Sequence, residues 1–109
     1  MKITQHATDH TLTLILDGEL DASSSVLLDN ELNQPTILNY QKVLIDCQRL
    51  NYISSAGLGV FISHLQRFQD ANVKLVFFNM QEKVHNVFEI LGLDALLTIV
   101  PSEAEATAI

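Results

Sequence analysis

Two short apolar segments constrain the fold of this chain more than any other feature of its sequence. They are Lys42–Cys47 (KVLIDC) and Val73–Phe78 (VKLVFF). Short, nearly continuous apolar runs are typical of strands that are buried on both faces of a sheet. Between the two runs, apolar side chains recur with helical spacing at Leu58, Phe61, Ile62, Leu65 and Phe68. A buried strand, an amphipathic helix and a second buried strand predict a parallel sheet that is covered by helices.

The segments on either side predict further elements. Lys2–His6 and Thr11–Leu16 read as strands that are joined by a turn at Thr8–His10, and Asp17–Asp21 breaks the second strand. Helices are expected at Ala22–Leu32, capped by Asp21 or a following serine, and at Gln81–Leu91, before Gly92. Gln48–Ser55 is expected to be a loop, Leu96–Val100 a short strand, and Ser102–Glu105 a capping box that opens a terminal helix.

These elements predict an α/β fold with an N-terminal β-hairpin and a mixed, mostly parallel sheet of about five strands. The 109 residues are 48% hydrophobic, which is enough to form one core, so we expect a single domain over residues 1–109. No apolar run approaches the roughly 18 residues that span a bilayer, so direct membrane insertion is not expected. The lone Cys47 and the lack of a secretory signal pattern predict a cytoplasmic protein.

The charge balance argues against nucleic-acid binding. The chain has 13 acidic and 6 basic residues, giving a formal net charge of −7. The basic residues are scattered along the sequence, whereas binding to phosphates draws its affinity from clustered positive charge.

No catalytic or cofactor motif is complete. Gly57-Leu58-Gly59 lacks the third glycine of a dinucleotide loop, because Ile62 stands there, and a nucleophile elbow at Ser55 would need a glycine in place of Ile53. The four histidines are dispersed, and His64 and His85 are predicted to be solvated on the polar sides of their helices. Cys47 reads as a small core residue. We therefore expect no enzyme activity, metal or cofactor.

The segment Ile53–Gly59 (ISSAGLG) opens the central helix with unusual residues. Ser55 is predicted to be the N-cap, yet Gly57 and Gly59 weaken the helix that it would cap. The glycines leave the first turn bare, so that a partner or an anion can approach, or one of them allows close packing on the sheet. A phosphate on a serine here would suit the helix N-terminus and would add a charge of roughly −1.5 to −2 to a docking surface.

Several motifs together resemble the STAS domains of anti-sigma factor antagonists. One is Leu44-Ile45-Asp46, followed by Leu50 and by Tyr52–Val60 (YISSAGLGV). Gly18–Ala22 (GELDA) resembles the exit of the family's second strand, and Val100–Ala106 (VPSEAEA) resembles the entry to its C-terminal helix. The resemblance covers the whole chain and implies a STAS fold.

The resemblance also implies a partner switch. In this family, the serine at the position of Ser55 is phosphorylated by a serine kinase that is usually the anti-sigma factor itself. The unphosphorylated protein binds that anti-sigma factor, phosphorylation ends the complex, and a PP2C-type phosphatase resets the switch. The loop that carries Asp21 is expected to lie beside the Ser55 loop. The implied partner-binding residues are Asp21, Ser54, Ser55, Ala56, Gly57, Leu58 and Gly59.

Two points stay open at the level of the sequence. Many members carry Asp immediately before the phosphoserine, whereas this chain has Ser54, so either of two adjacent hydroxyls could accept the phosphate. The alternative function is a STAS subunit of a membrane lipid-transporter complex, in which the same loop would be a docking surface and Ser55 merely a cap.

Overall fold

The computed structural model describes residues 1–109, which form a five-stranded sheet in the order β1-β2-β3-β4-β5. The strands are β1 (Lys2–Ala7), β2 (Thr11–Leu20), β3 (Lys42–Ile53), β4 (Lys74–Phe78) and β5 (Thr98–Val100). The β1–β2 pair is an antiparallel hairpin, and the other three pairings are parallel. The predicted mixed, mostly parallel α/β sheet with an N-terminal hairpin is therefore confirmed.

Four α-helices and two short 3₁₀ helices connect and follow the strands. They are α1 (Ser24–Leu32), η1 (Pro35–Asn39), α2 (Ser55–Asp70), α3 (Glu82–Ile90), η2 (Leu93–Ala95) and α4 (Glu103–Ala108). Gly92 follows α3 with a φ of 71°, the left-handed conformation that favours glycine at a helix end. The predicted cap of the last helix is also present, because the Ser102 hydroxyl accepts the Glu105 N–H at 3.3 Å.

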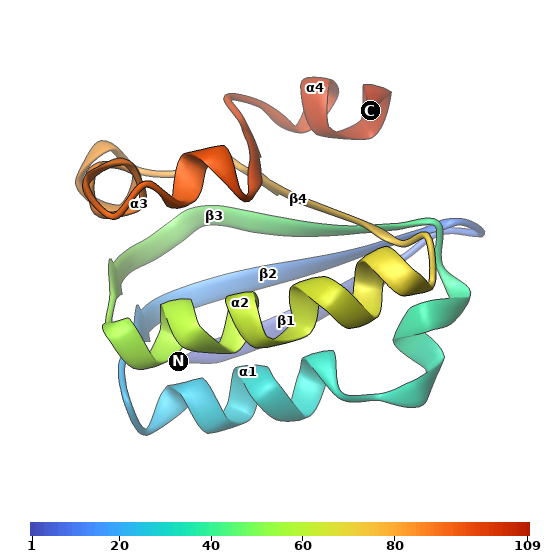
Figure 1. The fold of residues 1–109 in the computed structure, drawn as a ribbon, viewed down its shortest axis with the longest axis horizontal. Coiled ribbons are helices and arrows are strands. Elements are labelled where there is room, and N and C mark those ends of the chain that lie inside the picture. The colour runs from blue at the N-terminus through green and yellow to red at the C-terminus, as the bar shows by residue number, and fades with distance from the viewer.

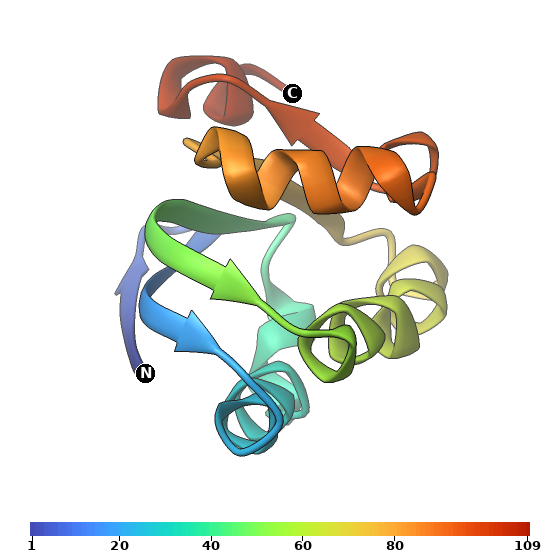
Figure 2. The same cartoon turned by 90° about the vertical axis from the view of Figure 1, so that its left-hand side faces the viewer.

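The helices cover the sheet unequally. Helices α1 and α2 run side by side along one face, and α4 lies on the opposite side (Figure 1). Figure 2 views α1 and α2 nearly end-on, with α1 below the ends of β2 and β3 and α2 to their lower right. Buried side chains of α1, α2 and α3 belong to the main core, whereas Ala106 of α4 closes a smaller cluster with Leu44, Val76 and Phe78. Both α1 and α2 begin at the end of the molecule where β2 and β3 finish.

Strands β2 and β3 are longer than the sequence predicts. The loop expected at Gln48–Ser55 is wrong up to Ile53, and the break expected after Leu16 is wrong as well, because the two strands stay paired to Leu20 and Ile53. The pairing contains two register shifts, and Gly18 adopts a φ of 117°. Such irregularities interrupt the alternation of apolar and polar residues by which a strand is recognised.

Phe77, on β4, is the centre of the aromatic core. Its ring is fully buried. The centroid of this ring lies 4.8 Å from that of Phe61, in an edge-on arrangement, and 5.9 Å from that of Phe88. Because these rings come from α2 and α3, Phe77 joins both helices to the sheet.

We expect Phe77→Ala to lower the free energy of unfolding by about 3–5 kcal/mol, because it leaves a cavity among these rings. Urea unfolding followed by circular dichroism measures the change. Ile90→Ala is the matched control: Ile90 is 82% exposed, and its truncation should change stability by less than about 0.5 kcal/mol. Equal losses in both variants would contradict this assignment of the core.

Candidate functional site

The carboxyl ends of β2 and β3 bring two segments of the candidate site together. Leu20 pairs with Ile53 in the last rung of the two strands, and the Ser54 N–H donates to the Leu20 carbonyl at 2.8 Å. Asp21 therefore follows one strand directly beside the point where Ser54 follows the other. The expected proximity of the Asp21 loop and the serine loop is confirmed, and its cause is the parallel register of the two strands.

Ser54, not Ser55, is the N-cap of α2. Ser54 has an extended backbone, and its hydroxyl accepts the Gly57 N–H at 3.2 Å. Ser55 is the first residue of the helix and is exposed. The predicted cap at Ser55 is wrong by one residue. Either of two adjacent serines can cap a helix that follows it. Which one becomes the N-cap therefore depends on where β3 ends and the chain turns away from the sheet.

The two glycines of the first helical turns have different roles. Gly57 is buried, and a Cβ atom there would lie 2.6 Å from Cγ of Leu20. Gly57 therefore allows α2 to pack closely against the end of β2, which is one of the two roles the sequence left open. Gly59 is exposed, and a Cβ atom there would meet nothing within 4 Å. Only Gly59 leaves the helix surface bare.

Asp21 is held in place by a reciprocal pair of hydrogen bonds with Ser24. The Ser24 N–H donates to Asp21 Oδ1 at 2.9 Å, and the Asp21 N–H donates to Ser24 Oγ at 2.9 Å. Donation from the Ser24 backbone N–H, followed by that from its hydroxyl, holds the pKa of Asp21 below its ordinary value. At neutral pH the loop therefore presents a carboxylate. Ser23 occupies the N-cap position of α1 but its side chain makes no capping bond, and it is Asp21 that accepts the N–H of Ser24, the first residue of the helix.

The start of α2 has free hydrogen-bonding capacity. The N–H groups of Ser55 and Ala56 donate to no acceptor in the chain, and both residues are exposed. Tyr52, which precedes them on β3, is 49% exposed. Free N–H groups at a helix N-terminus favour an anion. The site thus combines open donors on α2 with a carboxylate on the neighbouring loop.

Other residues considered from the sequence lie away from this site. Cys47 is a buried core residue as predicted, and burial raises the pKa of its thiol above the ordinary value. No three His, Cys, Asp or Glu side chains gather where they could hold a metal ion. None of the helices combines the length and the apolar character needed to cross a membrane.

The prediction for His64 is wrong, because this side chain is buried against α1. His64 is 5% exposed, and its Nε2 lies 2.8 Å from Oδ1 of Asp29. His85 fits its prediction better, since its side chain is 41% exposed and its Nδ1 lies 3.4 Å from Glu89 Oε1. No local pattern relates residues 29 and 64, which meet only because α1 and α2 lie side by side.

Comparison with known proteins assigns the fold to a family. A family model described as the STAS domain matches residues 2–106. The chain belongs to the STAS domain family. It is 31% identical over 108 residues to the BtrV protein of Bordetella bronchiseptica, covering 99% of this chain and 93% of that protein. It is 28% identical to the anti-sigma-B factor antagonist of Listeria monocytogenes, covering 96% of this chain and 91% of that one.

A solved structure shows the same STAS fold. The anti-sigma factor antagonist SpoIIAA in its unphosphorylated form superposes with a TM-score of 0.80, covering 97% of this chain and 93% of that one. The two sequences are 20% identical, so this likeness concerns the fold alone.

The two adjacent serines of this STAS domain should differ in their effect on stability. Ser54→Ala removes the acceptor of the Gly57 N–H and should cost about 1 kcal/mol of unfolding free energy. Ser55→Ala, at an exposed helical position, should change stability by less than about 0.5 kcal/mol. Chemical denaturation of both variants checks the order, and a larger loss in Ser55→Ala would contradict the capping role of Ser54.

The two glycines provide a second matched pair. Gly57→Ala should destabilise the domain by about 1–3 kcal/mol, because the new methyl group overlaps the buried Leu20 side chain. Gly59→Ala should stabilise it by about 0.5–1 kcal/mol, since alanine is the better helix former and the space is open. Thermal unfolding measures both shifts, and shifts of the same sign would refute the distinction.

Proposed function

We propose that this STAS domain is an anti-sigma factor antagonist that is switched by phosphorylation of Ser55. It is a non-catalytic cytoplasmic regulator. Unphosphorylated, it binds an anti-sigma factor that is also a serine kinase. Phosphorylation of Ser55 by that kinase ends the complex, and a PP2C-type phosphatase removes the phosphate. The name of the Listeria relative as an anti-sigma-B factor antagonist supports this assignment.

The observation that carries the choice of Ser55 is the different surroundings of the two serine hydroxyls. The Ser54 hydroxyl accepts a hydrogen bond as the cap of α2, and Ser54 is only partly exposed. The Ser55 hydroxyl forms no hydrogen bond, and the residue is exposed on the first helical turn. A kinase can therefore reach Ser55 without disturbing the cap, whereas a phosphate on Ser54 would require the cap to be rebuilt.

A phosphate on Ser55 is compatible with the fold. It would lie at the N-terminus of α2, close to the free N–H groups of Ser55 and Ala56. The roughly half positive charge of a helix N-terminus favours an anion there. Modification should therefore leave the domain folded and change its affinity for a partner.

The effect on a partner follows from charge. The unmodified loop presents the Asp21 carboxylate together with the neutral surface of Ser55, Ala56 and Gly59. A phosphate adds roughly −1.5 to −2 charge to a chain whose formal net charge is already −7. A partner that buries this surface would have to desolvate the new charge or pair it, and an unpaired charge in an interface costs several kcal/mol. Release is the expected result.

The residues proposed to make up the partner-binding site lie in the Asp21 loop and at the start of α2. They are Asp21, Ser54, Ser55, Ala56, Gly57, Leu58 and Gly59. Gly57 and Leu58 are buried, so we infer that they shape this surface from beneath, while Ser55, Ala56 and Gly59 touch the partner directly. The bare helix surface at Gly59 allows a partner backbone to approach closely.

The deciding experiment identifies the residue that carries the phosphate. The chain is incubated with ATP, Mg²⁺ and an anti-sigma factor kinase encoded in the same genome, and the site is mapped by mass spectrometry. We expect one phosphate, on Ser55, that is lost in Ser55→Ala and retained in the matched control Ser54→Ala. In a binding assay, Ser55→Asp should bind the kinase at least about tenfold more weakly than Ser55→Ala, a difference of about 1.4 kcal/mol.

Two outcomes would overturn the proposal. Equal affinity of Ser55→Asp and Ser55→Ala would exclude release by charge. Failure of every such kinase to modify Ser55, combined with co-purification of the chain with membrane-transporter subunits, would favour the structural STAS subunit.

A further inference from the structure

Helix α1 is held by little apolar surface. Its large buried apolar side chains are Leu28 and Leu32, and its other buried residues are Ser24 and Ser25. Its remaining large apolar side chains, Val26 and Leu27, are 59% and 50% exposed. Since the free energy of burial scales with the apolar area removed from water, apolar packing alone anchors α1 weakly.

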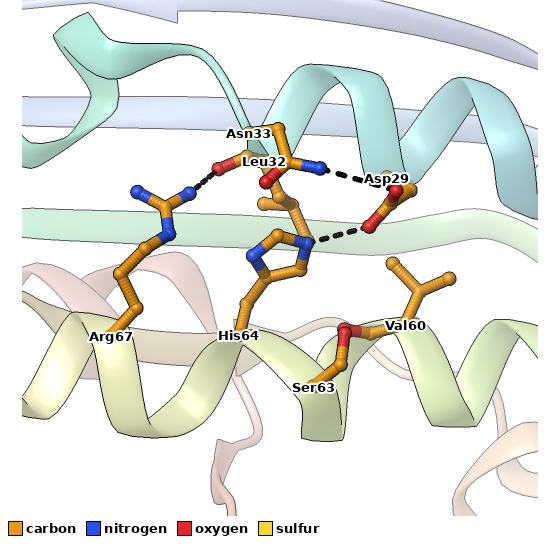
Figure 3. A network of polar contacts seen from close by, with 7 residues as sticks. All are labelled: Asp29, Leu32, Asn33, Val60, Ser63, His64 and Arg67. Carbon is orange, nitrogen blue, oxygen red and sulfur yellow. Dashed lines mark hydrogen bonds and ion pairs between the residues drawn. The ribbon is translucent and has the colours of Figure 1, made fainter.

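Polar contacts with α2 supply the missing anchor (Figure 3). The His64 ring of α2 points toward α1, and its Nε2 lies 2.8 Å from Oδ1 of Asp29. The other oxygen of Asp29 accepts Nδ2–H of Asn33 at 3.1 Å. One helical turn further along α2, the Arg67 guanidinium donates to the Leu32 carbonyl at the end of α1.

Within this network, His64 is the member that cannot exchange its partner for water. It is 5% exposed, whereas the Asp29 side chain is 42% exposed. A carboxylate oxygen only accepts, so Nε2 carries the hydrogen. While α1 and α2 stay packed together, loss of the Asp29 oxygen would leave a buried N–H without an acceptor, which is costly. The bond therefore fixes where α1 lies on α2.

The position of α1 also determines the position of the Asp21 loop. Asp21 is bonded reciprocally to Ser24, the first residue of α1. Ser55 is the first residue of α2. The relative placement of the Asp21 carboxylate and Ser55 thus depends on how the two helices lie against each other.

We propose that His64 is a positioning residue, which holds α1 against α2 through Asp29 and so sets the Asp21 loop beside Ser55. This inference rests on the proposed function, because the surface so positioned is the one assigned to the kinase partner. His64 itself lies in the interior between the helices, where a partner docked on the surface would not reach its side chain.

The test compares three variants of the full chain. His64→Leu fills the space without a donor, and His64→Gln places an amide N–H where Nε2 stands. His85→Leu is the matched control, because His85 lies on α3 and pairs only with Glu89 on its own helix. Amide hydrogen exchange by NMR is followed at Ser24 and at Val76, which is buried in β4. Affinity is measured for the kinase that phosphorylates Ser55.

In His64→Leu we expect the Ser24 amide to exchange about tenfold faster while that of Val76 is unchanged, because the opening involves α1 and not the sheet. Affinity for the kinase should fall about tenfold, which equals about 1.4 kcal/mol. His64→Gln should restore both values to within about threefold of wild type, and His85→Leu should change neither.

Equal acceleration at Ser24 and Val76 would show a purely structural role and overturn the inference. Local acceleration at Ser24 with wild-type affinity would overturn it as well, since α1 would then be irrelevant to binding. If the wild-type chain binds no kinase, the proposed function fails. In that case, the amide exchange rates of His64→Leu would still show whether His64 holds α1 in place.

Discussion

The site depends on one contact, the meeting of β2 and β3 at their carboxyl ends. Leu20 and Ile53 pair in parallel register, and the Ser54 N–H continues the ladder by donating to the Leu20 carbonyl. The same Leu20 side chain lies against Gly57 at the start of α2. Two loops that are more than thirty residues apart in the sequence are thereby joined by one hydrogen bond and one close packing contact, and the helices that follow them start from the same edge of the sheet.

Around this contact, neighbouring residues of the same type have different structural roles. Ser54 caps α2, while Ser55 stays exposed beside N–H groups that have no acceptor. Gly57 is required for packing, while Gly59 leaves the surface bare. The cap at Ser54 and the close contact at Gly57 hold the start of the helix against the end of the sheet, and they leave the Ser55 hydroxyl exposed. This division explains why a helix begins with residues that are poor helix formers.

Much of the fold could be predicted because its elements have clear periodicities. The hairpin, the parallel strands, the central helix and the terminal cap follow from local patterns of apolar, polar and capping residues. The continuation of β3 through Gln48–Ile53 could not be predicted, because the register shifts interrupt the alternation that marks a strand. The burial of His64 could not be predicted for another reason: a polar residue on a helix is expected to be solvated unless its partner, here Asp29 on α1, is known.

By itself, the sequence determined the class of fold, the order of its elements and the segment that forms the site, because hydrophobic periodicity and the small residues of Ile53–Gly59 are local properties. It predicted the cap at Ser55 and not at Ser54, and it left Gly57 and Gly59 equivalent. Only the tertiary structure decided which serine caps the helix and which glycine is required for packing. The capping residue depends on where β3 leaves the sheet, and the side-chain volume tolerated at each glycine depends on where Leu20 lies. The contact between α1 and α2 that buries His64 was likewise decided by packing, since hydrogen-bond partners 35 residues apart leave no pattern in a single chain.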